Sequence, residues 1–149
     1  MATSETSVFP FPPKRIYFGA DVPKRLIHRY ADAIAAEFQP ERIILFGSHA
    51  YGTPHEASDV DLLVVMPTRN SHDAAVRIQY RLTAPFPVDL IVRTPAQMAS
   101  RLAEKESFLT TVVSEGRVLY EKGDARVGQE GRTGLRPRRA RQSKRRAGS

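Results

Sequence analysis

Three aspartates lie in strand-like segments of the sequence, at a spacing that can support chemistry. Asp59 and Asp61 open an apolar run that continues to Val65, and Asp89 lies within a second apolar run. Carboxylates two residues apart on a strand point to the same face, because side chains alternate along it. Carboxylates gathered at the end of a buried strand are unfavourable without a cation. Because hard oxygen ligands favour Mg²⁺ or Mn²⁺, the pattern predicts metal-dependent phosphate chemistry.

A glycine–serine pair follows the apolar run that precedes these aspartates. Gly47 permits a sharp turn after residues 43–46, and a helix starting at Ser48 would direct N–H groups and a hydroxyl toward phosphate. The segment is not a P-loop, because Thr53 stands where that loop needs lysine. Nor is it an EF-hand, because apolar residues follow the aspartate pair. The alternative is structural, with one aspartate capping a strand and the others solvated. The complete set of turn, pair and single carboxylate favours a functional site.

Regular elements must position these groups, and periodicity predicts where they lie. Apolar residues at helical spacing indicate an amphipathic helix over about 23–38, with Asp21 as its N-cap and Gln39-Pro40 as its end. Ser71 is the predicted cap of a second helix, and Gly116 the predicted end of a last one. Strands are expected at about 42–46, 59–66, 87–92 and 117–120, and further helices at about 72–83, after Thr94-Pro95 and around 108–113.

Composition divides the chain into three parts. At 149 residues it has room for one domain, and the absence of cysteine excludes disulfides, Cys-ligated zinc and thiol catalysis. The net charge of +7 belongs to the end of the chain, where residues 124–149 carry nine Lys or Arg and two acidic residues. Residues 1–123 carry 14 of each sign. We therefore predict an extended lead-in at 1–20, one domain at 21–122 and a basic, disordered tail at 123–149.

Neither a leader peptide nor a membrane span is expected. Met1 to Pro13 lacks the basic start and apolar centre of a signal peptide, and no uncharged apolar run has the length of a membrane span. A cytoplasmic protein without membrane contact is therefore the expectation. The tail has no aromatic residue to stack on bases, so any contact with nucleic acid would be nonspecific and salt-sensitive.

The motif resembles that of a known superfamily. Gly47-Ser48, ten intervening residues and Asp59-Val60-Asp61 are similar to the signature of the DNA polymerase beta-type nucleotidyltransferases, especially their small, single-domain members called minimal nucleotidyltransferases. Residues 86–95 and 115–121 also resemble segments of the family, and the likeness covers about residues 24–122. This resemblance implies the polymerase beta-like α/β (α+β) fold, a mixed β-sheet with helices packed on one side.

The resemblance also implies a reaction and roles for the residues. A nucleoside monophosphate, as AMP from ATP or from another nucleoside triphosphate, would be transferred to a hydroxyl and pyrophosphate released. Asp59 and Asp61 would bind one Mg²⁺, and with Asp89 a second, with Mn²⁺ as a substitute. Asp89 would also take the hydroxyl proton. Gly47 and Ser48 would hold the terminal phosphates.

Two positions depart from the pattern of the family. Many relatives carry arginine at the positions of His49 and Tyr51, where a cation can reach phosphate. His49 is expected to replace that contact only weakly, and Tyr51 cannot replace it by charge. The three aspartates are all present, so we interpret the difference as variation.

The acceptor is expected on another polypeptide. Small members of the family are commonly paired with a HEPN-type helical protein in toxin–antitoxin modules, and the resemblance implies adenylylation of such a partner. Two alternatives stay open: a non-catalytic antitoxin that acts by binding its partner, and a nucleic-acid-binding module that acts through the tail. Three clustered carboxylates argue against the first, and deletion of residues 124–149 would test the second, because nucleic-acid affinity should then vanish.

Overall fold

Four short apolar segments pair into one sheet, in the order β3-β2-β1-β4. The computed structural model describes residues 15–123, so the predictions for residues 1–14 and for the basic tail lie outside this part of the chain. The strands are β1 (Arg42–Phe46), β2 (Val60–Val65), β3 (Val88–Arg93) and β4 (Arg117–Glu121). β1 is antiparallel to β2 and β4, and β2 is parallel to β3. The end of β1 and the starts of β2 and β3 therefore lie at the same end of the sheet.

The helices of the described chain begin and end close to the predicted positions. They are α1 (Lys24–Phe38), α2 (Ser48–Tyr51), α3 (Ser71–Arg81), α4 (Pro95–Ala103) and α5 (Ser107–Glu115). Thr94 and Gln97 form a capping box at the start of α4. Two predicted caps are wrong. The side chain of Asn70, not Ser71, accepts a hydrogen bond at the start of α3, and Asp21 ends a short 3₁₀ turn, Gly19–Asp21, instead of capping α1.

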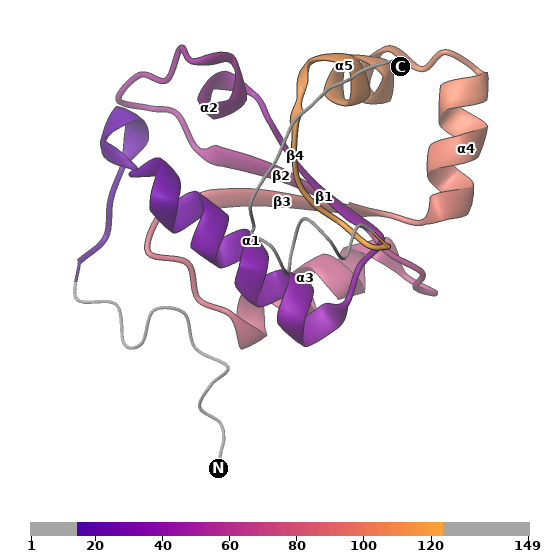
Figure 1. Ribbon diagram of the computed structural model, residues 1–149, viewed down its shortest axis with the longest axis horizontal. Coiled ribbons are helices and arrows are strands. Elements are labelled where there is room, and N and C mark those ends of the chain that lie inside the picture. Colours follow the sequence, from indigo (N-terminus) through magenta and orange to yellow (C-terminus); the bar gives the residue numbers. More distant parts are fainter. Residues whose placement is uncertain (1–14, 124–149) are drawn as a thin grey trace.

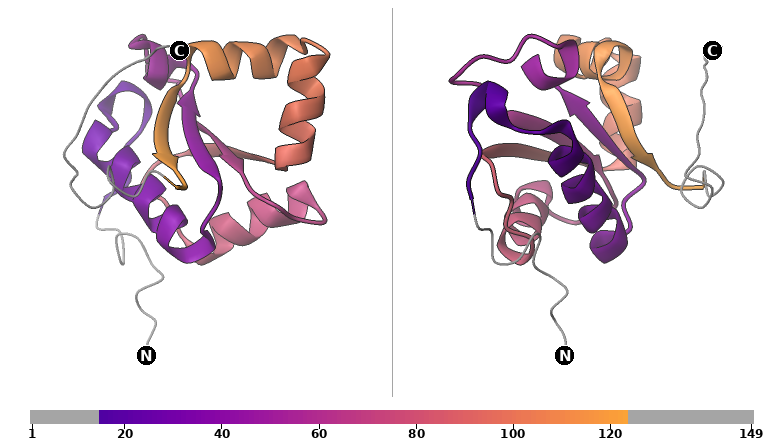
Figure 2. Two further views of the ribbon diagram at one scale, coloured as in Figure 1. Left: turned by 45° about the vertical axis from the view of Figure 1, so that its right-hand side comes forward. Right: turned by 60° about the vertical axis from the view of Figure 1, so that its left-hand side comes forward.

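The mixed α/β fold class is confirmed, but the placement of all helices on one side of the sheet is wrong. α1 and α3 cover one face, and α4 and α5 cover the other (Figure 1 and Figure 2). In β1, Ile43 and Leu45 pack with α1 and α3, whereas Ile44 and Phe46 pack with α5. Because successive residues of the strand are all apolar, both of its faces need a cover.

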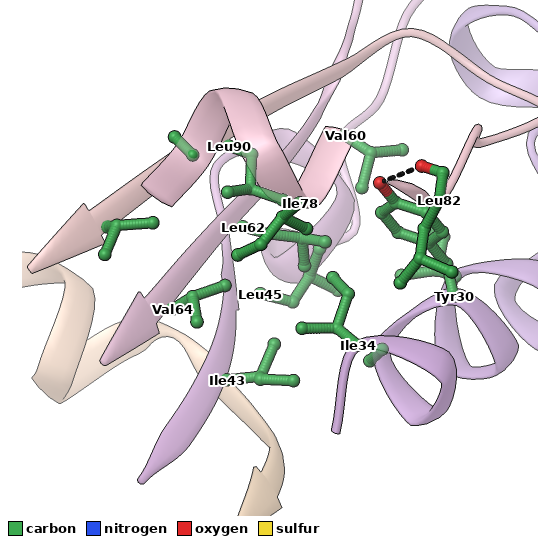
Figure 3. Close-up of a cluster of buried hydrophobic side chains, with 14 of the residues drawn as sticks. Tyr30, Ile34, Ile43, Leu45, Val60, Leu62, Val64, Ile78, Leu82 and Leu90 are labelled. Carbon is green, nitrogen blue, oxygen red and sulfur yellow. Dashed lines mark hydrogen bonds between the residues drawn. The ribbon is translucent and has the colours of Figure 1, made fainter. Parts of the chain in front are cut away.

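The larger of the two cores lies between the sheet and helices α1 and α3 (Figure 3). Tyr30 is fully buried there, and its hydroxyl donates a hydrogen bond of 2.8 Å to the carbonyl oxygen of Leu82. This bond satisfies the one polar atom of a large side chain in an apolar environment and joins α1 to the end of α3. The end of the sheet that carries the aspartates is thus supported by a well-packed layer on the face covered by α1 and α3.

Within residues 15–123, no helix has the length and apolar character needed to cross a membrane.

Candidate active site

Asp59, Asp61 and Asp89 lie close together at the end of the sheet where β2 and β3 begin. Asp61 and Asp89 are the second residues of their strands and are partners in the parallel register, and Asp59 directly precedes β2. The side chains of Leu62 and Leu90 enter the core beneath α1 and α3, so the preceding aspartates face the opposite side, toward α4 and α5. The expected convergence of three carboxylates on one face is therefore what the fold produces.

Asp61 occupies the most strongly perturbed position of the three. Burial raises its pKa, and the negative charges of Asp89 and Asp59 raise it further, from 3.8 to about 6. Asp61 is half-buried, whereas Asp59 and Asp89 are exposed. Within residues 15–123, none of these carboxylates has a hydrogen-bond or ion-pair partner. The cluster thus carries uncompensated negative charge.

Gly47 lies directly against the carboxylate of Asp61. Its φ angle is +77°, in the region that favours glycine, and a Cβ atom placed on it would lie 2.1 Å from Asp61 Oδ2. The contact follows from the register, in which Asp61 pairs with Phe46, the residue before the turn. The predicted glycine–serine turn is therefore in contact with the aspartates.

A hydrogen-bonded serine pair links the turn to the loop before β2. Ser48 Oγ donates to Ser58 Oγ over 2.9 Å, and Ser58 Oγ also accepts a hydrogen bond from the backbone N–H of His55 at 2.9 Å. Ser58 is only 7% exposed and directly precedes Asp59. We did not single out Ser58 from the sequence, although its place next to the aspartate pair was a usable signal.

His49 is buried, which changes what it can contribute. Only 5% of the residue is exposed, and its Nε2 atom is buried with no hydrogen-bond partner among residues 15–123. Burial lowers the pKa of His49, Lys24 lowers it further, and Asp59 opposes both. The imidazole is therefore neutral at physiological pH. Lys24, the first residue of α1 and also missed from the sequence, is a cation close enough to act on this region.

The short helix α2 is fixed from the other side by β4. Arg117, at the start of β4, donates a hydrogen bond of 3.0 Å from Nε to the carbonyl oxygen of Ala50. This bond satisfies a carbonyl at the end of a helix of only four residues. Nothing local in the sequence indicated it, because the two residues are 67 positions apart.

Four other polar residues are either at the far end of a strand or exposed to solvent. Arg93 is at the far end of β3, opposite Val65, and is four residue steps along the strand from Asp89, or about 13 Å. His28 and His72 are exposed on α1 and α3. Tyr51, the last residue of α2, is 42% exposed.

The donor set fits a hard divalent cation in its chemistry. Carboxylate oxygens are the ligands that Mg²⁺ and Mn²⁺ prefer, and a cation would offset the repulsion that raises the pKa of Asp61. In the described part of the chain, no group of three or more acidic or histidine side chains is arranged closely enough to hold an ion as it stands. Binding would therefore draw the carboxylates closer together.

Several known proteins are similar to this chain. A crystal structure of a "putative nucleotidyltransferase" from Sulfolobus solfataricus is similar to 67% of this chain and 81% of its own, at 19% identity and a TM-score of 0.47. A protein of Methanocaldococcus jannaschii named "Putative protein adenylyltransferase" is 28% identical over 99 residues, which cover 65% of this chain and 97% of that protein. The family described as "Nucleotidyltransferase domain" matches residues 27–113, which include all three aspartates and the Gly47-Ser48 turn. The chain belongs to this nucleotidyltransferase family, whose reaction transfers a nucleotidyl group from a nucleotide substrate.

Proposed function

We propose that the chain transfers AMP from ATP to a hydroxyl group of a partner protein. The observation that carries this proposal is the position of Asp61, between the glycine–serine turn and Asp89. Its carboxylate touches Gly47 on one side and is repelled by Asp89 on the other. A triphosphate held at the turn would therefore present its α-phosphorus beside Asp61, with an acceptor entering from the side of Asp89.

The transfer exchanges one bond to the α-phosphorus for another and releases one proton. The acceptor oxygen forms a bond to the α-phosphorus, the bond from that phosphorus to the bridging oxygen breaks, and pyrophosphate leaves. We propose that the carboxylate of Asp89, which is exposed near the start of β3, accepts the hydroxyl proton. In-line attack fits the order of the strands, because β1 with the turn and β3 with Asp89 flank β2 on opposite sides.

Asp59 and Asp61 would hold one Mg²⁺, and the three aspartates together a second. The bound ions would neutralise the triphosphate and favour the ionised acceptor hydroxyl. Mn²⁺ has the same preference for oxygen ligands and would replace Mg²⁺. The support is the donor set and the mutual repulsion of its carboxylates.

The phosphates would be held by the turn itself. Gly47 and Ser48 bring the chain close to the site, and Ser48 and His49 are the first residues of α2, whose backbone N–H groups have no partner within that helix. Because the imidazole of His49 is buried, we assign the contact of this residue to its backbone N–H. The nearby cation is Lys24.

A protein acceptor is favoured by the name of one relative. The Methanocaldococcus jannaschii protein, of which 97% is matched, bears the name of a protein adenylyltransferase. The resemblance to minimal nucleotidyltransferases adds a HEPN-type helical protein as the class of partner. Both considerations support ATP as the donor and a hydroxyl side chain of the partner as the acceptor.

Transfer of label from ATP into proteins of a host lysate tests the proposal. Native chain and an Asp59→Asn/Asp61→Asn variant are incubated with Mg²⁺ and ATP labelled at either the α- or the γ-phosphate. We expect a protein band labelled from the α-position only, and by the native chain only. Its mass then identifies the acceptor.

Each other outcome would point to a different function or a different set of catalytic groups. Label from the γ-position would indicate a kinase and overturn the assignment. Label that survives in the double variant would show that the aspartates are not the catalytic groups. No labelled band, together with capture of a partner by both native chain and variant, would favour an antitoxin that acts by binding alone.

A further inference from the structure

Residues 15–22, which we call the N-terminal strap, lie before α1 and before the region matched by the family. In Figure 1 this indigo segment rises beside the sheet toward the end where α2 lies. Its last residue, Val22, is buried in the core, and Tyr17 packs against the same core. The strap is therefore attached to the domain, and it contacts two loops that lead into the carboxylate-bearing strands.

The first contact joins the strap to the loop before β2. Gly19 is buried, with a φ angle of +53°, and a Cβ atom placed on it would lie 2.5 Å from the carbonyl oxygen of Glu56. The Cα and carbonyl carbon of Glu56 would both lie 2.7 Å from it. Only glycine fits this approach of two backbones without a shift of one of them. Glu56 is three residues before Asp59.

The second contact joins the strap to the loop before β3. The backbone N–H of Tyr17 donates a hydrogen bond of 2.8 Å to the carbonyl oxygen of Pro85, four residues before Asp89. The guanidinium of Arg15 lies 4.6 Å from the centre of the Tyr17 ring, which adds a cation–π contact to the strap. The start of β2 is also joined to the loop before β3, because the N–H of Val60 donates to the carbonyl oxygen of Pro87 over 3.1 Å.

We propose that the N-terminal strap is a positioning element of the active site, which fixes the entry of β2 and the entry of β3 relative to each other. The strap holds one backbone point upstream of Asp59 and one upstream of Asp89, so a change in its packing shifts the carboxylates against each other. Its effect on the reaction rests on the proposed function, whereas its effect on the two loops does not. The residues of the strap touch no reacting group and act only through these loops.

Gly19→Ala tests the first contact, and Gly123→Ala is its matched control. Both glycines have positive φ angles, +53° and +90°, so alanine strains the backbone at both positions. Among residues 15–123, the control has no atom within 4 Å of the added Cβ, whereas the test variant meets the backbone of Glu56. Faster exchange at the loop that carries Glu56, in the test variant and not in the control, therefore reports the displacement of that loop.

The measurement is amide hydrogen exchange, followed by the kinetics of transfer. In Gly19→Ala we expect exchange at residues 53–60 and 83–89 to accelerate about tenfold over the control, with β1 and β4 unchanged. The kcat of transfer should fall about tenfold or more. The KM for ATP should rise as well, because the displaced loop carries Ser58, which is hydrogen-bonded to Ser48 of the turn that holds the phosphates. A purely structural role would accelerate exchange throughout the domain and leave kcat unchanged well below the melting temperature.

A second pair of variants covers the case in which Gly19→Ala does not fold. Tyr17→Pro removes both the ring and the N–H that donates to Pro85, whereas Tyr17→Ala removes the ring and keeps the N–H. Faster exchange at residues 83–89 in the proline variant than in the alanine variant supports the proposal. The proposal is overturned if the two variants of each pair exchange at equal rates in these loops. It is also overturned if exchange in the loops is faster while kcat is unchanged. If the native chain itself transfers no label, the proposed function fails, and the exchange pattern alone decides whether the strap fixes the loops.

Discussion

Replacing Asp61 by asparagine should stabilise the protein at neutral pH in the absence of a divalent cation. Burial and the charges of Asp89 and Asp59 raise the pKa of Asp61 from 3.8 to about 6. An acid whose pKa is raised in the folded state binds more protons there than in the unfolded state. Its contribution to stability is therefore complete below about pH 4 and is lost as the pH rises through 6. Asparagine has nearly the same shape and carries no charge at any pH.

The size of the effect follows from the same values. A rise in pKa from 3.8 to about 6 corresponds to roughly 3 kcal/mol for a charge that is fully removed from water. Asp61 is only half-buried, and solvent screening reduces this to about 1 kcal/mol. For a domain of about 100 residues, 1 kcal/mol corresponds to an increase in melting temperature of roughly 4–8 °C.

Urea denaturation followed by far-ultraviolet circular dichroism measures the difference, since the chain has no tryptophan to report by fluorescence. Asp61→Asn should be the more stable form at pH 7.5 and equal to the native chain at pH 3.5. Adding Mg²⁺ should stabilise the native chain and leave the variant unchanged. Glu121→Gln, which removes an exposed carboxylate at the end of β4, is the control for loss of charge alone. A variant that is less stable than the native chain at pH 7.5 would refute the electrostatic account of the site.

Four further substitutions test separate parts of the site. Gly52→Ala should lower the free energy of unfolding by about 1 kcal/mol, because Gly52 is in the left-handed region. Gly47→Ala should lower it more, because the φ and ψ angles of Gly47, +77° and −163°, are essentially restricted to glycine and its added Cβ meets the carboxylate of Asp61. Only Gly47→Ala should reduce transfer, by about a hundredfold, and an equal loss of transfer in both variants would contradict this. Ser58→Ala should cost about 1–3 kcal/mol in a urea titration and raise the KM for ATP more than it lowers kcat, and an unchanged KM would count against a role in holding the phosphate turn. Asp89→Asn should lower kcat by about 10²–10⁴ while binding of a fluorescent ATP analogue persists, and a variant with normal kcat would exclude Asp89 as the base.

Elements with local signals were predicted well. The helical spacing of apolar residues placed α1 within one residue of its observed bounds, Lys24–Phe38, and the run Ile43-Ile44-Leu45-Phe46 placed β1. The capping signals were less certain, because Asn70 and Ser71 are adjacent and either can accept a hydrogen bond at a helix start. Only the observed hydrogen bond decides between two neighbouring residues of this kind.

Features that depend on distant contacts were not predicted. The hydroxyl of Ser48 binds Ser58 across ten residues, and Arg117 binds Ala50 across 67, and neither pair has a pattern in the sequence. The second layer of helices had a signal that we did not use. A strand such as β1, apolar on both faces, needs cover on both sides, and the predicted helices after β3 were available to supply it. The burial of His49 also depends on packing from other elements and could not be inferred from its place after the turn.

The distribution of apolar residues over the two faces separates stability from chemistry. The face under α1 and α3 holds the larger buried cluster, to which β1, β2 and β3 all contribute. On the other face, Asp61 and Asp89 take the places where the apolar alternation of their strands would continue with residues such as Leu63 and Ile91. Substitution of these aspartates therefore removes no packing from the main core. Variants without activity should stay folded, which makes them suitable for capturing the acceptor and for testing whether binding persists without transfer.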